Sequence, residues 1–279
     1  MTTTPQSCYV TILDREIHYM AWGNAAAPPI ILWHGLARTS RDFDALAAAL
    51  SDRYHLIAPD TLGRGLSEWS PYPAEEYCLD FYVRLAVGLC DAVKISQLRW
   101  VGTSMGGAIG LRAATGPLRD RITHLVLNDI GPEIASAAVN RIRSYAGQPP
   151  AFARISELEA YFRTVYKPYG FLTDAQWRHL TETSARRLPD GRVTPHYDPK
   201  IVHQFESHPE DYQQWSAYDA VTAQVLCLRG VDSDLLLPEV AQEMTQRGPR
   251  CQLVTVPNCG HAPALNVPAQ IKLIENFLA

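Results

Sequence analysis

The chain contains the stretch Gly102-Thr-Ser104-Met-Gly-Gly107, which directly follows an apolar run and opens a helical pattern. A serine on such a strand-to-helix turn is held in a strained backbone conformation, with its hydroxyl projecting above the sheet. Glycines flank it because larger side chains would clash in so tight a turn. The helix expected over about 104–114 points its N-terminus at the serine and so favours negative charge that develops nearby. Ser104 is therefore the candidate nucleophile, although a glycine-rich loop with an incidental serine would share this pattern.

On both sides of this stretch, short apolar runs alternate with helical patterns. After a predicted edge hairpin (8–13 and 16–22), the expected strands are 30–33, 54–58, 98–102, 124–128, 225–229 and 252–256. The expected helices between and after them are 39–50, 75–93, 104–114, 238–247 and 268–278. Runs that are apolar throughout and separated by helices are typical of a buried parallel sheet. The sequence therefore predicts an α/β fold with a mostly parallel sheet flanked by helices.

This alternation stops from about Gly131 to Tyr218, where no convincing buried strand is expected and helical signals dominate. Ser156–Glu159 and Thr173–Gln176 both fit capping boxes at helix starts. Aromatic residues are dense in this segment. We therefore expect an α/β core formed by residues 1–132 and 216–279, and a helical cap (lid) formed by residues 133–215.

Composition excludes several function classes. With 25 Lys and Arg against 29 Asp and Glu, the net charge is −4 and no basic run tracks phosphates, so nucleic acid is not expected as a partner. No signal peptide is evident, and no apolar run approaches the roughly 20 residues that span a bilayer. The six cysteines contain no C-x-x-C pair and are interpreted as reduced core residues. These features favour a cytoplasmic protein that does not bind membranes.

A serine nucleophile needs a histidine base that is oriented by a carboxylate. His261 follows the predicted strand 252–256, and loops after parallel strands emerge at one edge of the sheet, which places it near Ser104. The acid is expected on the loop after strand 225–229, where Asp232 and Asp234 are both available. Asp129, at the end of strand 124–128, is a third candidate, and spacing alone does not separate the three.

The oxyanion hole needs two backbone amides aimed at the substrate carbonyl oxygen. The amide of Met105, directly after the nucleophile, is one candidate. The amide of Leu36 is the other, because Gly35 lets the loop after strand 30–33 turn closely. His34 is expected to fix this loop through hydrogen bonds rather than to act on substrate.

Together these features resemble the α/β-hydrolase superfamily, which has the order nucleophile, acid, histidine. The resemblance rests on His34-Gly35, the segment 60–67 (Asp-Thr-Leu-Gly-Arg-Gly-Leu-Ser), the Ser104 turn and Gly260-His261, and it covers about residues 8–132 and 216–279. It implies that the segment 60–67 supports the loop behind the nucleophile. Since family members with Arg-Gly-x-x-Ser-Asp after this strand use the aspartate that follows the serine, it favours Asp234 as the acid.

Departures from the family narrow the activity. Haloalkane dehalogenases and epoxide hydrolases of this fold carry aspartate where this chain has Ser104, and C–C hydrolases usually carry an aromatic residue where it has Ala262. An esterase, lactonase or thioesterase that acts on a small, moderately hydrophobic acyl compound is therefore expected. The C–C hydrolase of ring-fission products and a non-catalytic ligand receptor remain as alternatives. The expected acyl transfer needs no metal or organic cofactor, and the lid aromatics are also compatible with a homodimer contact.

Overall fold

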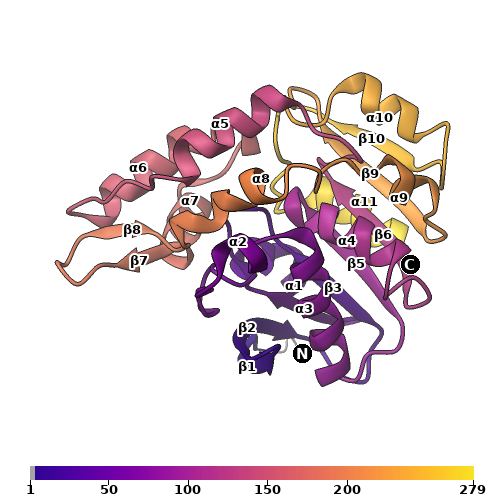
Figure 1. Cartoon of the computed structure of the whole chain (residues 1–279), viewed down its shortest axis with the longest axis horizontal. Helices are drawn as coiled ribbons and strands as arrows, with labels where there is room; N and C mark the ends of the chain where they lie inside the picture. Colours follow the sequence, from indigo (N-terminus) through magenta and orange to yellow (C-terminus); the bar gives the residue numbers. More distant parts are fainter. Residues whose placement is uncertain (1–3) are drawn as a thin grey trace.

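The computed structural model describes residues 4–279, and its main sheet has eight strands in the order β1-β2-β4-β3-β5-β6-β9-β10 (Figure 1). The strands are β1 (Gln6–Ile12), β2 (Arg15–Trp22), β3 (Pro29–Trp33), β4 (His55–Pro59), β5 (Leu98–Thr103), β6 (Ile122–Asn128), β9 (Gln224–Gly230) and β10 (Gln252–Val256). β2 pairs antiparallel with β1 and with β4. The pairs from β4 across to β10 are parallel. The predicted hairpin and mostly parallel sheet are confirmed.

Helices cover both faces of this sheet. The helices of the core are η1 (Ser40–Phe43), α1 (Asp44–Leu50), α2 (Pro73–Glu76), α3 (Leu79–Ala92), α4 (Met105–Thr115), α10 (Pro238–Met244) and α11 (Pro268–Leu278). In β3, Ile31 and Trp33 pack in the same cluster as α3 and α4, whereas Ile30 and Leu32 pack in the cluster that contains α1 and α11. This alternation follows from the two-residue period of a strand, and two covered faces explain why the strands are apolar throughout.

Most of the chain between β6 and β9 forms a layer of its own beside the carboxyl ends of the parallel strands (Figure 1). This layer contains α5 (Ser136–Ala146), α6 (Ile155–Val165), η2 (Lys167–Tyr169), α7 (Asp174–Thr183), β7 (Ala185–Arg187), β8 (Val193–Pro195), η3 (Pro199–His203) and α8 (Gln204–Ser207). The helix that follows, α9 (Trp215–Asp219), contacts α4 in the core. Leu158, Phe162 and Trp177 form a separate small core with Val193. We call residues 133–215 the insertion.

Two expectations about the insertion are wrong. A short antiparallel pair, β7 with the buried strand β8, lies where no buried strand was expected, because three residues are too few to display an alternating pattern. The helix start at Ser156 is also misplaced, since α6 begins at Ile155 and Glu157 accepts from the Arg154 amide at 3.3 Å. The Thr173 box is confirmed, with the Gln176 amide donating to Thr173 Oγ1 at 3.3 Å.

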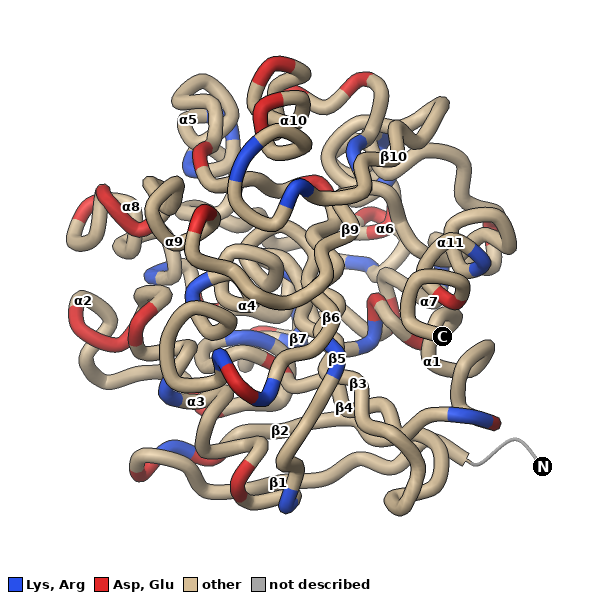
Figure 2. Tube along the Cα trace, turned by 90° about the vertical axis from the view of Figure 1, so that its right-hand side faces the viewer, with Lys and Arg blue, Asp and Glu red and all other residues tan. Residues whose placement is uncertain are grey.

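The surface and the cysteines agree with the compositional reading. Figure 2 shows Lys and Arg segments interspersed with Asp and Glu segments on the side that it draws. All six cysteines are free thiols, and five of them are buried. Within residues 4–279, none of the helices has the length and apolar character needed to cross a bilayer.

Candidate active site

Ser104 lies on a strained turn between β5 and α4. Its backbone has φ 53° and ψ −120°, a left-handed conformation that L residues rarely adopt. A Cβ atom on Gly106 would lie 1.9 Å from the Trp33 carbonyl oxygen, so only glycine fits there. The turn is therefore fixed by its neighbours, and it presents a serine hydroxyl at the carboxyl edge of the sheet.

His261 completes a hydrogen bond with this serine. The Ser104 Oγ and His261 Nε2 atoms are 2.9 Å apart, across 157 residues of sequence. The His261 side chain is 12% exposed, so it sits at the bottom of a solvent-reachable opening. The expectation that the loop after β10 brings a histidine to Ser104 agrees with this geometry.

Asp129 is the carboxylate that contacts His261. Its Oδ2 atom lies 2.7 Å from His261 Nδ1, and the side chain is fully buried. The Gly230 amide donates to its Oδ1 at 2.8 Å, and the Ser233 hydroxyl donates to its Oδ2 at 2.6 Å. These two donors therefore hold the carboxylate in place behind the imidazole.

Asp234, the acid that the resemblance favoured, does not contact His261, and this expectation is corrected. Its two carboxylate oxygens accept from Arg141 Nε at 2.7 Å and Nη2 at 2.9 Å, and its side chain is 51% exposed. Asp232 is exposed as well and makes no hydrogen bond to His261. The physical reason is that Asp234 forms an ion pair at the surface with Arg141 of the insertion. Ser233, the residue before Asp234, points inward and donates to Asp129.

The two expected oxyanion donors are both free. In the described chain neither the Leu36 amide nor the Met105 amide donates to a protein group. Arg64 supports the loop that carries Leu36, because its Nε donates to the Leu36 carbonyl at 2.8 Å. Arg64 is fully buried and also donates to the Tyr82 hydroxyl at 2.7 Å. The segment 60–67 was expected to support the loop behind the nucleophile, whereas this contact of Arg64 supports the loop that carries Leu36.

His34 fixes the same loop. Its Nδ1 lies 2.6 Å from the Gly35 carbonyl, and its Nε2 accepts from the Thr61 amide at 2.9 Å. Complete burial lowers the pKa of His34 to about 4, despite the opposing charge of Asp60. His34 is thus neutral near neutral pH, and its two hydrogen bonds agree with the expected role of fixing this loop.

Comparison with known proteins decides the family. The group described as the alpha/beta hydrolase family matches residues 30–271, which is most of the chain. The chain belongs to the alpha/beta hydrolase family. It is 38% identical to the 3-hydroxybutyrate-oligomer hydrolase of Cupriavidus necator, over 99% of this chain and 99% of that protein.

Solved structures of alpha/beta hydrolases share its architecture. One from Novosphingobium aromaticivorans has a TM-score of 0.89 and 32% identity, and the match covers 99% of this chain and 98% of that one. The structure of E-2-(acetamidomethylene)succinate hydrolase has a TM-score of 0.86 and 26% identity, over 99% of both chains. The predicted fold is confirmed, and the protein is a hydrolase.

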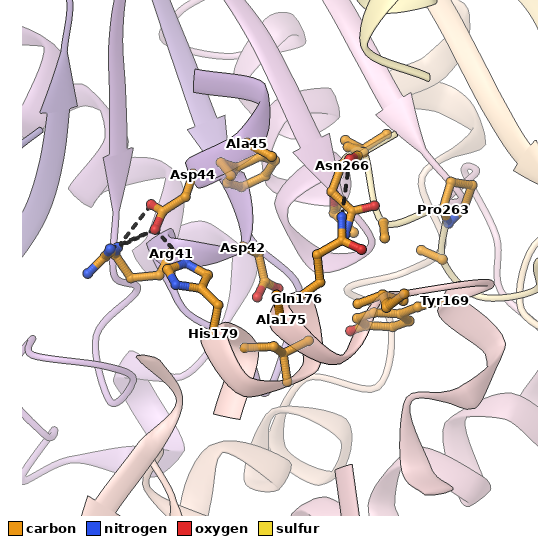
Figure 3. A pocket seen from close by; sticks show the side chains of 17 residues that line it. Arg41, Asp42, Asp44, Ala45, Tyr169, Ala175, Gln176, His179, Pro263 and Asn266 are labelled. Atoms are coloured by element: carbon orange, nitrogen blue, oxygen red, sulfur yellow. Dashed lines mark hydrogen bonds and ion pairs between the residues drawn. The ribbon is translucent and has the colours of Figure 1, made fainter. Parts of the chain in front are cut away.

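Three spaces adjoin Ser104 in this alpha/beta hydrolase. Ser104 itself lines a pocket of about 40 Å³, which we call the Ser104 pocket; the insertion contributes to its wall Arg141, Tyr145, Val165, Tyr166 and Tyr169. On the His261 side an open groove of about 640 Å³ also contains Arg141 and Asp234. On the other side a cavity of about 250 Å³ lies between η1, α7 and residues 262–266 (Figure 3). Thr103, Tyr169 and Ala262 line both this cavity and the Ser104 pocket.

Two features of this site were absent from the sequence prediction. Arg38 lines the Ser104 pocket although it had no assigned role, and its only signal was its position two residues after Leu36. Arg64 lay inside a quoted motif, but nothing in the sequence indicated its hydrogen bond to Leu36. In residues 4–279, no group of three or more His, Cys, Asp or Glu side chains is arranged to hold a metal ion.

Proposed function

We propose that this hydrolase cleaves small carboxylic esters through an acyl-enzyme formed on Ser104. The observation that carries the proposal is the hydrogen-bonded chain Ser104–His261–Asp129, with separations of 2.9 Å and 2.7 Å. An imidazole that a buried carboxylate orients can accept the serine proton as the hydroxyl attacks a carbonyl carbon. Asp129, rather than Asp234, holds the imidazole in the required tautomer.

The proposed reaction has two acyl-transfer steps. His261 takes the proton of Ser104, and the amides of Leu36 and Met105 stabilise the oxyanion of the tetrahedral intermediate. His261 then protonates the leaving alcohol, and the acyl-enzyme remains. A water molecule repeats the sequence, again with His261 as base, and releases the acid and free Ser104.

The insertion is proposed to act as the cap that selects the acyl group, because its side chains form much of the wall of the Ser104 pocket. The relative from Cupriavidus necator acts, by its name, on 3-hydroxybutyrate oligomers. Its 38% identity over nearly the whole of both chains supports a short linear ester of a hydroxy acid as the substrate class.

The test compares the wild type with Ser104→Ala on p-nitrophenyl esters from acetate to decanoate and on a 3-hydroxybutyrate trimer. We expect turnover by the wild type and a loss of several orders of magnitude in the variant, as for loss of a triad member. A fluorophosphonate probe should label the wild type and not the variant, and matching circular dichroism spectra control for folding. Retained turnover in Ser104→Ala would refute the mechanism, and an inert wild type would redirect the search to lactones and C–C substrates.

A further inference from the structure

Arg38 lines the Ser104 pocket and carries a buried hydrogen-bond donor without a partner. The residue is 3% exposed, and its Nε donates to Asp42 Oδ2 at 2.9 Å. Nη2 donates to the other oxygen of Asp42. Nη1 is buried and has no hydrogen-bond partner in the described chain. Because a buried donor without a partner destabilises a fold, an acceptor atom of a ligand would be stabilising at this position.

Among the residues that the structure describes, the rest of the pocket wall carries hydroxyl groups and no carboxylate. The hydroxyls of Tyr145 and Tyr169 make no hydrogen bond to a described residue, and burial raises the pKa of both, so they keep their protons. No Asp or Glu side chain of residues 4–279 lines the pocket. Arg38 Nη1, which can donate but not accept, therefore has no acidic partner in this wall and suits a ligand that brings an oxygen acceptor.

The charge balance favours an uncharged acceptor. Burial alone would lower the pKa of Arg38, but Asp42 outweighs it and raises the pKa well above its usual value, so the guanidinium stays charged. The Arg38–Asp42 pair is neutral as a whole. Arg141, the other arginine of the pocket wall, is likewise paired, with Asp234. A carboxylate placed on Nη1 would therefore add an unpaired negative charge, whereas an ether, ester or hydroxyl oxygen would not.

The geometry also indicates which part of an ester meets Arg38. His261 lines both the Ser104 pocket and the open groove, whereas Arg38 lines the pocket and not the groove. Since His261 must protonate the leaving alcohol, we place the alcohol on the side of the groove. Arg38 instead donates a hydrogen bond to Asp42, which lines the cavity of Figure 3. Tyr169 lies in the wall between that cavity and the Ser104 pocket. The acyl group is therefore the part that passes Arg38.

We propose that Arg38 selects acyl groups that carry an uncharged acceptor oxygen, which its Nη1 binds beside Ser104. This inference rests on the proposed function and deepens it, because each unit of a hydroxy-acid oligoester carries such an oxygen on its acyl chain. The Ser104 pocket, at about 40 Å³, is little larger than the space of about 30 Å³ that one water molecule occupies in the liquid. Acyl binding therefore requires part of the pocket wall to move outward.

The test uses two p-nitrophenyl esters that differ in one atom: 3-methoxybutanoate, and 3-methylpentanoate, in which a methylene replaces the ether oxygen. We expect the wild type to prefer the methoxy ester in kcat/KM by about tenfold, the scale of one hydrogen bond to a charged donor. In Arg38→Lys the ammonium still pairs with Asp42 but lacks a second nitrogen to take the place of Nη1. The preference for the methoxy ester should therefore fall to near one. Arg53→Lys, at an exposed pair with Glu275, is the matched control and should keep the wild-type ratio.

A second variant tests the charge argument. Asp42→Asn removes the negative partner, so it should raise the turnover of the mono-p-nitrophenyl ester of glutaric acid relative to p-nitrophenyl 5-methylhexanoate. If Asp42→Asn leaves the ratio of the two turnover rates unchanged, the charge argument is wrong. The role of Arg38 is refuted if the wild type shows a methoxy preference near one, or if Arg38→Lys keeps the wild-type preference. Melting temperatures and fluorophosphonate labelling establish that each variant has a formed site. Turnover of these esters by Ser104→Ala would instead refute the proposed function, so the two failures are distinguishable.

Discussion

The Asp129 carboxylate reaches His261 Nδ1 at 2.7 Å although β9 lies between the strands that the two residues follow. This is achieved because β9 ends at Gly230, whose amide donates to Asp129 while its missing side chain lets the loops cross. A Cβ atom at Gly230 would lie 2.2 Å from the Gly260 carbonyl oxygen. The acid therefore comes from the end of β6, with β9 contributing only hydrogen-bond donors.

Exchange of each aspartate for asparagine separates the two candidate acids. Asp129→Asn keeps the shape but can stabilise the wrong imidazole tautomer, so kcat should fall by about 10⁴, as in other serine triads. Asp234→Asn loses one exposed ion pair with Arg141, and its loss should not exceed about tenfold. Initial rates with p-nitrophenyl butanoate measure both. Equal losses in the two variants would contradict the assignment of Asp129.

The fold could be predicted because the apolar runs have lengths and spacings that only a covered parallel sheet satisfies. The sequence also identified Ser104 and His261, since each follows a strand at the same sheet edge. It could not separate Asp129 from Asp234, because both loops end at that edge. The deciding contact, Arg141 with Asp234, joins residues 93 positions apart and depends on how the insertion folds over the core.

The unpaired Nη1 of Arg38 was beyond prediction for a related reason. An arginine four residues before an aspartate, such as Arg38 before Asp42, is typical of an ion pair on the surface of a helix. Arg38 is buried only because the insertion packs against it. The guanidinium carbon lies 4.7 Å from the centre of the Tyr166 ring, on a helix end more than a hundred residues away in sequence. Long-range packing of this kind leaves no local pattern.

Arg64 should matter for both folding and turnover. Arg64→Met leaves the Leu36 and Leu62 carbonyls without a buried donor, so the free energy of unfolding should fall by at least about 3 kcal/mol. The Leu36 loop should also shift, and kcat should fall by about 10²-fold, the cost of a misplacement near 1 Å. Urea unfolding and initial rates give the two values. Arg143→Met, at an exposed pair with Glu206, is the control and should change stability by less than about 1 kcal/mol.

The turn that carries Ser104 predicts a contrast between two glycines. Gly106→Ala would place a methyl group 1.9 Å from the Trp33 carbonyl oxygen, so β3 and α4 must separate. We expect a loss of about 3 kcal/mol or more, the upper end of overpacking costs. Gly35→Ala meets its nearest atom, Ser104 Cβ, at 3.6 Å, an ordinary contact, and should cost less than about 1 kcal/mol. Similar unfolding midpoints for the two variants would show that the turn is not constrained as described.

His34 predicts how stability depends on pH. Burial lowers its pKa to about 4 in the folded protein, whereas an unfolded histidine titrates near 6.5. Between these values the unfolded chain binds the proton and the folded protein does not. The free energy of unfolding therefore falls as pH decreases from about 6.5 to 4, and below about pH 4 His34 causes no further loss. From pH 7 to pH 5 His34 lowers the free energy of unfolding by about 2 kcal/mol.

Urea unfolding at both pH values should give a smaller difference in the free energy of unfolding in His34→Asn than in the wild type. Burial lowers the pKa of His55, His124 and His196 in the same direction, so the comparison with this variant, rather than the total slope, isolates His34. The same slope in both proteins would mean that His34 is not the group that titrates.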